Sequence, residues 1–106
     1  MTTRSVSPDT MKEVAPYLAE LTEKVVFGNI WERKELSKRD RSLITVAMLI
    51  ALYRTDQLRG HLRRALDNGV TREEIAEVIT HCAFYAGWPT AANAVGVAKG
   101  VFDERK

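Results

Sequence analysis

Cysteine is nearly absent from this chain, and neither sign of charge is in large excess. The 106 residues include one cysteine and carry a formal net charge of +2. A single cysteine cannot form an internal disulfide bond, which excludes a disulfide-stapled scaffold. The 16 basic residues are spread among 14 acidic ones. This pattern gives no basic stripe of the kind that binds nucleic acid, so no nucleic-acid partner is expected.

Long apolar runs are missing as well. The longest, residues 43–53, is interrupted only by Thr45 and has about half the length that a helix needs to cross a bilayer. The beginning of the chain lacks the apolar core of a secretory signal peptide. We therefore expect a cytoplasmic protein with no membrane partner, and the chain length predicts a single domain over residues 1–106.

The apolar residues recur at the three- and four-residue spacing of helices, and alternating strand patterns are absent, so the sequence predicts an all-α fold. Ser7 can cap a first helix, which Pro16 then interrupts. Ser37 can cap a second, over residues 38–53. Because this second helix is apolar almost all round, we expect it to be the central buried helix.

Three further helices are predicted in the second half of the chain. Thr55 begins one that ends at residues 67–69, and Thr71 begins another with a capping-box pattern. Residues 87–89 end that helix, and Thr90 caps the last one. The last helix is rich in alanine and glycine, which allow helices to approach closely. Together with an apolar central helix, this composition predicts that the chain buries surface against copies of itself.

The side chains suited to proton transfer or thiol chemistry near neutral pH are few: His61, His81 and Cys82. Arg54, Gln57 and His61 share one stripe of a predicted helix. A guanidinium, an amide and an imidazole on one face suit a site for a small acid, in which the imidazole passes a proton. The alternative is a helix end with ordinary polar residues.

Other candidate residues leave two interpretations open. Cys82 lies on an apolar stripe and is favoured as a core residue, and His81 as a structural or interfacial one. Arg41 opposes the helix dipole near the start of its helix, so it requires an anion or an acidic partner. Trp31 either walls a pocket or fills the core, and Trp88 forms either a rigid aromatic lip or merely a turn.

The sequence does not support several common kinds of functional site. Two histidines and one cysteine, with no acidic cluster at ligand spacing, give no basis for a metal site. A glycine-rich phosphate loop and a serine-elbow motif are both absent. Arg63 and Arg64, beside Asp67 on a predicted helix, are interpreted as a solvated face rather than a phosphate site.

Three ordered blocks of the sequence resemble a known family. They are FGNIWERKELSKRDRSLITVAMLI, LRGHLRRALDNGVTREEIAEVI and FYAGWPTAANA. Together they resemble the carboxymuconolactone decarboxylase family, within the alkylhydroperoxidase D-like superfamily. The resemblance runs from about Phe27 to Phe102. It implies a bundle of about five to six helices that assembles as a homo-oligomer, commonly a hexamer built as a trimer of dimers.

The resemblance also implies an activity. The founding enzyme of the family decarboxylates 4-carboxymuconolactone in the β-ketoadipate pathway of aromatic catabolism, without a cofactor. Loss of CO₂ leaves an oxyanion that must be stabilised and a carbon that must be protonated. His61 matches the family histidine and is the expected proton donor. Arg41 and Arg54 are the expected carboxylate clamps, with Arg33 as a third. Aromatic side chains are expected to wall the pocket: Trp31, Tyr85 and Trp88.

The chain departs from both branches of the superfamily. The hydroperoxidase branch has a CxxC motif where this chain has Arg54 and Gln57, so peroxide reduction through a disulfide is not expected. The decarboxylase resembled here has a glutamate at Gln57 and a second histidine at Gly96, a place that His81 does not occupy. These departures leave the substrate open.

Four hypotheses follow from these observations. The leading one is a cofactor-independent decarboxylase of an unsaturated lactone acid. The second is a related enzyme for another small carbonyl or lactone acid. The third is a thiol-dependent antioxidant using Cys82, which requires an exposed thiol with a lowered pKa. The fourth is a non-catalytic oligomeric binding module, favoured if His61 is sealed from any cavity.

Overall fold

The computed structural model of the chain describes residues 6–105, and all regular structure within them is helical. The predicted all-α class is therefore confirmed, while residues 1–5 and 106 of the predicted domain lie outside the described residues. The elements are α1 (Pro8–Val14), α2 (Pro16–Leu21), the π-helical η1 (Thr22–Phe27), the 3-10 helix η2 (Ile30–Glu32), α3 (Lys38–Ala51), α4 (Thr55–Asp67), α5 (Arg72–Ala86) and α6 (Trp88–Glu104). None of the described helices is long and apolar enough to cross a membrane.

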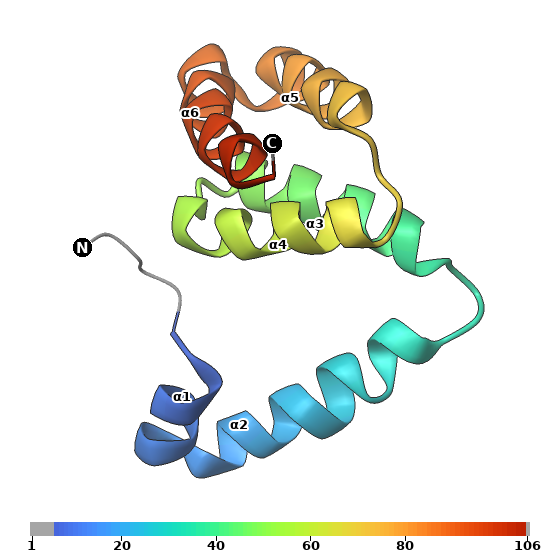
Figure 1. The fold of residues 1–106 in the computed structure, drawn as a ribbon, viewed down its shortest axis with the longest axis vertical. Coiled ribbons are helices and arrows are strands. Elements are labelled where there is room, and N and C mark those ends of the chain that lie inside the picture. Colours follow the sequence, from blue (N-terminus) through green and yellow to red (C-terminus); the bar gives the residue numbers. More distant parts are fainter. Residues whose placement is uncertain (1–5, 106) are drawn as a thin grey trace.

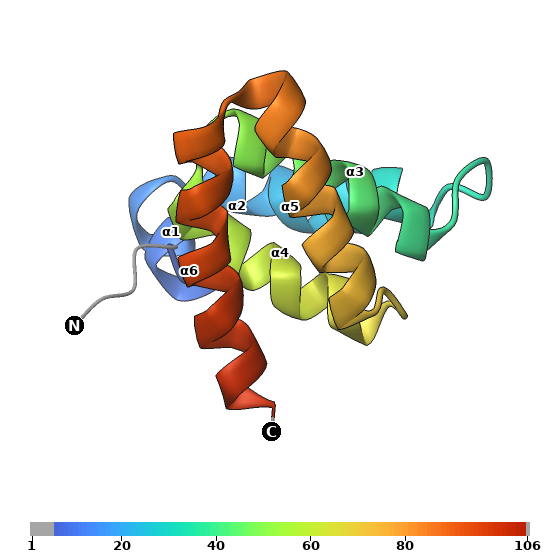
Figure 2. The same cartoon turned by 90° about the horizontal axis from the view of Figure 1, so that it is seen from above.

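The helices form three layers (Figure 1). The α5–α6 hairpin packs on one side of the α3–α4 hairpin, and these four helices are called the bundle below. On the other side lies the segment from α1 to η1, residues 8–27, called the arm below. The view from above shows α5 and α6 side by side over the α3–α4 layer (Figure 2). The arm joins the bundle through η2, which packs on α3.

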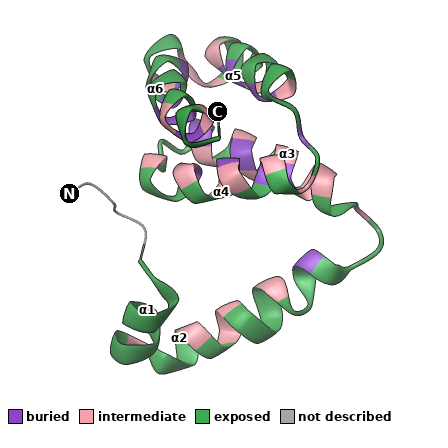
Figure 3. Ribbon diagram, in the orientation of Figure 1, coloured by how far each residue is buried: buried purple, intermediate pink, exposed green. Residues whose placement is uncertain are grey.

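The hydrophobic core lies inside the bundle. Leu58 and Leu62 of α4 are buried, and they pack with apolar residues of α3, α5 and α6. Buried positions are concentrated in α3–α6, whereas the arm is exposed or half-buried along its length (Figure 3). Between residues 6 and 41, Trp31 is the one buried residue. The arm therefore has no core of its own.

Local capping signals located most helix starts correctly. Ser37 Oγ accepts a hydrogen bond from the Asp40 N–H at 3.0 Å, which satisfies a donor at the start of α3. Thr71 and Glu74 form a reciprocal capping box at the start of α5. The break predicted at Pro16 is also confirmed, because α1 ends at Val14 and Pro16 begins α2.

The predicted start of the last helix was wrong. The helix α6 begins at Trp88 with Gly87 as its N-cap, rather than with Thr90 as the cap. Gly87 has φ 113°, a left-handed conformation that glycine adopts without steric cost, and this allows the chain to reverse in one residue. Pro89 then fits the first turn, where its missing N–H has no partner to lose.

The prediction for the apolar helix was also wrong in part. The helix α3 ends at Ala51, two residues before the predicted end, and Tyr53 beyond it has a positive φ of 62°. One of its stripes is buried, but Ile44 and Met48 are 49% and 52% exposed. In a single chain the other elements cover only part of the circumference of α3, which leaves an apolar stripe facing solvent.

Candidate active site

His61 lies on α4 with its imidazole half-buried against Trp31. The two rings are stacked, with centroids 6.0 Å apart and an angle of 26° between their planes. Its Nδ1 atom is buried and has no hydrogen-bond partner among the residues that the structure describes. Buried polar atoms are nearly always paired in folded proteins. The imidazole is therefore held in place by stacking, and one of its nitrogens lacks the partner that a buried polar atom usually has.

Trp31 is held between the arm and the bundle. It lies in η2, is 8% exposed and stacks on Phe27 with ring centroids 5.8 Å apart. Phe27, Trp31 and His61 thus form a continuous stack, called the aromatic column below. The guanidinium carbon of Arg64 lies 4.3 Å from the Phe27 ring centroid and 5.6 Å from that of Trp31. These are cation–π distances, so Arg64 covers the side of the column.

The surroundings of His61 favour its neutral form. Burial removes water from the imidazole and lowers its pKa below the ordinary value of 6.5, and the positive charge of Arg64 lowers the pKa further. A neutral imidazole has one donor and one acceptor nitrogen. The free protein therefore presents His61 as a group that can accept a proton or a hydrogen bond near neutral pH.

Arg41 is half-buried in the first turn of α3, close to η2. Its Nη2 donates a hydrogen bond to the backbone carbonyl of Arg33 at 3.2 Å, while its Nε is buried without a partner among residues 6–105. The acidic partner expected from the helix dipole is thus replaced by a carbonyl group. The side chain of Arg33 is exposed and lies 3.5 Å from the Glu35 carboxylate. Among residues 6–105, Arg41 and His61 are the residues with an unpaired buried side-chain nitrogen; Arg41 contacts the C-cap of η2, and His61 contacts Trp31 within it.

The other predicted clamp lies elsewhere on the chain. Arg54 precedes α4 and is exposed, as is Gln57 one turn later. The predicted stripe thus runs from solvent at Arg54 to the core at Ala65, with His61 between them. Arg41 and Arg54 lie near opposite ends of α3, which at 1.5 Å per residue places them roughly 20 Å apart along the helix. A single chain does not bring both to one small ligand.

The remaining aromatic candidates belong to the α5–α6 layer, whereas His61 faces η2. Tyr85 is 83% exposed and stacks on His81 with ring centroids 4.8 Å apart. Trp88 is 66% exposed and meets Phe84 edge to face at 5.6 Å. The described chain therefore does not place Tyr85, His81 or Trp88 against His61.

Cys82 is a core residue, as the sequence favoured. It is 7% exposed, and its Sγ lies 4.0 Å from the carbonyl oxygen of Ala47 on α3. Burial raises the pKa of its thiol. The antioxidant hypothesis required an exposed thiol with a lowered pKa, and the structure shows the opposite on both counts.

Two members of the site were missed at the level of sequence. Arg63 and Arg64 were both interpreted as a solvated face, and Arg63 does form an exposed ion pair with Glu104 at 2.8 Å. Arg64 instead lies over the aromatic column. Its spacing of three residues from His61 places both on one helix face, and this signal could have identified it. Phe27 was named only as the start of the family resemblance.

Comparison with known proteins identifies the family of the chain. A sequence model of the carboxymuconolactone decarboxylase family matches residues 16–100, which include the aromatic column and every predicted site residue. The chain belongs to the carboxymuconolactone decarboxylase family. The matched stretch begins at α2, so α1 lies outside it.

The chain is similar to proteins from three organisms. Over 81 residues the chain is 44% identical to a 4-carboxymuconolactone decarboxylase of Acinetobacter baylyi, covering 76% of this chain and 60% of that protein. It is 34% identical over 85 residues to the nitrosuccinic acid decarboxylase of Metarhizium robertsii, covering 80% and 59%. An uncharacterized 15.0 kDa protein of Paracoccus denitrificans is 29% identical over 96 residues, covering 89% and 72%. The chain thus spans about three fifths of the length of the two decarboxylases.

Proposed function

We propose that this protein is a carboxy-lyase that decarboxylates 4-carboxymuconolactone, or a similar unsaturated lactone acid, without a cofactor. The observation that carries the proposal is the half-buried imidazole of His61, stacked on Trp31 with an unpaired Nδ1. The 44% identity to a 4-carboxymuconolactone decarboxylase supports the same reaction. This activity would place the protein in aromatic catabolism through the β-ketoadipate pathway.

The chemistry requires one proton donor and one stabilised oxyanion. The bond between the substrate carbon and its carboxylate breaks, CO₂ leaves, and the electron pair enters the unsaturated lactone as a dienolate. A proton from His61 then forms the new C–H bond. His61 is mostly neutral in the free protein, but an anion bound beside an imidazole raises its pKa, since opposite charge favours the imidazolium form. Binding of the acidic substrate would thus create the donor it needs.

Arg41 is the better placed of the predicted carboxylate clamps. Its contact with the Arg33 carbonyl fixes one edge of the guanidinium, while its buried Nε has no partner within the described part of the chain. A guanidinium held in this way suits the planar geometry of a carboxylate. In this proposal Arg41 binds a carboxylate of the lactone acid, and the exposed Arg33 is the weaker third candidate.

The remaining clamp and wall residues fit a site completed by a second copy of the chain. Arg54, Gln57, Tyr85 and Trp88 are exposed and lie away from the His61 imidazole within one chain. Exposed apolar side chains supply surface for assembly, among them Ile44, Met48, Leu52, Phe84 and Val95. We propose a homo-oligomer, with the family hexamer as the expected form. A purely monomeric mass in sedimentation equilibrium would contradict this proposal.

A kinetic comparison of the two histidines tests the activity. The purified protein is mixed with 4-carboxymuconolactone, and CO₂ release is followed for the wild type, His61→Ala and the control His81→Ala. Loss of a positioned general acid costs about 10²- to 10⁴-fold in rate. We expect that loss in His61→Ala and near wild-type turnover in His81→Ala, since His81 is exposed on α5. Equal turnover in all three proteins would remove His61 from the mechanism.

A nitro acid is the second candidate substrate, supported by one relative and by the residues at positions 57 and 96. The chain has Gln57 and Gly96 where the resemblance leads us to expect a glutamate and a histidine, and it is 34% identical to a nitrosuccinic acid decarboxylase. A nitro group, like an unsaturated lactone, can accept the electron pair released with CO₂. Nitrosuccinate is therefore included in the same assay, and a higher kcat/KM for it than for the lactone would favour this alternative.

A further inference from the structure

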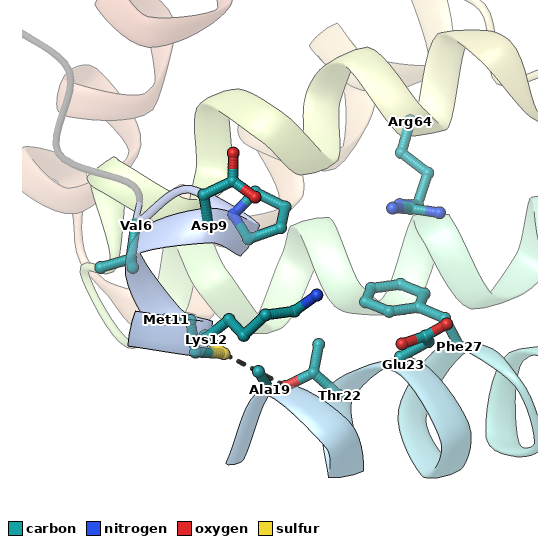
Figure 4. Close-up of a pocket in the computed structure, with 10 residues that line it drawn as sticks. Val6, Asp9, Met11, Lys12, Ala19, Thr22, Glu23, Phe27 and Arg64 are labelled. Atoms are coloured by element: carbon teal, nitrogen blue, oxygen red, sulfur yellow. Dashed lines mark hydrogen bonds between the residues drawn. The ribbon is translucent and has the colours of Figure 1, made fainter. Parts of the chain in front are cut away.

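A cavity of about 510 Å³ lies between the arm and α4 (Figure 4). Its size is within the range of small-molecule sites. Side chains of α1, α2 and η1 form one side, and Arg64 of α4 forms the other. Phe27, the first ring of the aromatic column, also lines it. The cavity therefore adjoins the Phe27 end of the aromatic column, whereas Trp31 and His61 are not among its lining residues.

Two cations line this cavity without forming ion pairs among residues 6–105. They are Lys12 of α1 and Arg64 of α4. Figure 4 shows the Lys12 side chain directed toward the Phe27 ring, over which Arg64 lies. Two acids, Asp9 and Glu23, also line the cavity, so the cations form a local positive region within a mixed lining.

Arg64 is suited to bind an anion while it remains in place. Its guanidinium lies against the Phe27 ring, and a stacked guanidinium keeps the N–H donors at its edge available to a carboxylate. It also stands one turn from His61 and acts on the imidazole through its charge. An anion held by Arg64 would therefore lie on the arm side of the reacting group.

We propose that Arg64, assisted by Lys12, binds the carboxylate that the substrate keeps after decarboxylation, so that the enzyme selects dicarboxylic acids. This inference rests on the proposed decarboxylase activity. Lys12 lies before residue 16, outside the stretch that the family model matches, and Arg64 lies within it. The cavity thus combines a matched helix with an arm segment that the family match does not include.

The test compares a diacid with its half-ester. The wild type, Arg64→Gln and Lys12→Gln are assayed with 4-carboxymuconolactone and with its analogue in which the retained carboxylate is a methyl ester. Removing a charge-assisted contact to a group that does not react should raise KM by about tenfold for the diacid, with kcat within about threefold. For the ester, Arg64→Gln should leave KM close to that of the wild type. Lys12→Gln should show the same pattern with a smaller effect.

Controls separate binding from packing. Arg63→Gln removes the neighbouring arginine, which pairs with Glu104 and does not line the cavity, and it should leave both KM values unchanged. Arg64→Lys should recover part of the diacid KM because it keeps the charge. If Arg64 only supported the aromatic column, Arg64→Gln would raise KM equally for diacid and ester, and that result overturns the proposal, as would no change for either.

A binding measurement keeps the inference testable if no substrate turns over. Trp31 fluorescence, in a Trp88→Phe background that removes the other tryptophan, is titrated with succinate and with butyrate. Quenching by succinate alone, lost in Arg64→Gln, would support the anion site even if the proposed reaction fails. Equal responses to the two acids would overturn it, whatever the outcome of the activity assay.

Discussion

Replacing Trp31 with alanine should release the arm from the bundle while the bundle stays folded. Trp31 is the one buried residue between residues 6 and 41, and it lies in η2, through which the arm joins α3. It is not a member of the hydrophobic core cluster, whose buried residues run from Val46 to Val101. The cost of the substitution should therefore fall on the attachment of the arm rather than on the folding of α3–α6.

The magnitude follows from the buried area. A tryptophan side chain buries about 200 Å², which at roughly 25 cal/mol per Å² amounts to about 5 kcal/mol. Trp31 is 8% exposed, so nearly all of this applies, and an alanine keeps a small part of it. A loss of about 3–4 kcal/mol agrees with the usual cost of replacing a buried tryptophan with alanine. At about 1.4 kcal/mol for each factor of ten, the open arm becomes roughly 10²- to 10³-fold more populated.

Limited trypsin digestion measures that population. When opening is faster than cleavage, the cleavage rate follows the fraction of open molecules. We expect cleavage at Lys24 and Lys34 to accelerate by about 10²-fold or more in Trp31→Ala. Trp88→Ala, in which a tryptophan that is 66% exposed is lost, is the matched control and should digest like the wild type. Digestion of Trp31→Ala within about threefold of the wild type, or simultaneous cleavage inside α3–α6, would refute the reasoning.

Two further predictions concern titratable side chains. Because the pKa of His61 is lowered on folding, the unfolded chain binds this proton more readily below pH 6.5, so the free energy of unfolding should fall as the pH is lowered from about 7.5 to about 5.5. Urea unfolding of His61→Gln should show a smaller fall, and identical slopes would contradict the lowered pKa. Cys82, buried and with a raised pKa, should react with a thiol reagent at neutral pH only after urea is added. Complete reaction of the native protein within seconds would show that it is accessible.

Helix starts and breaks that depend on residues nearby in the sequence were predicted correctly. Ser37 and Thr71 cap helices through hydrogen bonds to residues three positions later, and Pro16 interrupts a helix through its own ring. The start of α6 was predicted too late because Thr90 is a preferred N-cap residue type, whereas the observed N-cap is Gly87. The positive φ of Gly87, which the chain reversal requires, decided between them.

The exposure of side chains and the groups that they contact were predicted less well. The apolar composition of α3 predicted full burial, but composition does not say how many neighbours surround a helix, and Ile44 and Met48 remain exposed in one chain. Arg63 and Arg64 are identical in type and adjacent in sequence. Only the tertiary structure assigns them different partners: α6 brings Glu104 to Arg63, and the packing of the arm and η2 beside α4 brings the aromatic column to Arg64.

The sequence by itself determined the helical class, most helix boundaries and the family, because hydrogen bonding and hydrophobic periodicity act among residues about four positions apart. It also identified His61 as the candidate for proton transfer. Only the tertiary structure decided that Trp31, thirty positions earlier, stacks on that imidazole and that Arg64 lies beside both. Burial and the pKa of a buried group depend on which distant segments exclude water from it and which charges they bring. Those quantities arise when the arm, η2 and α4 pack together.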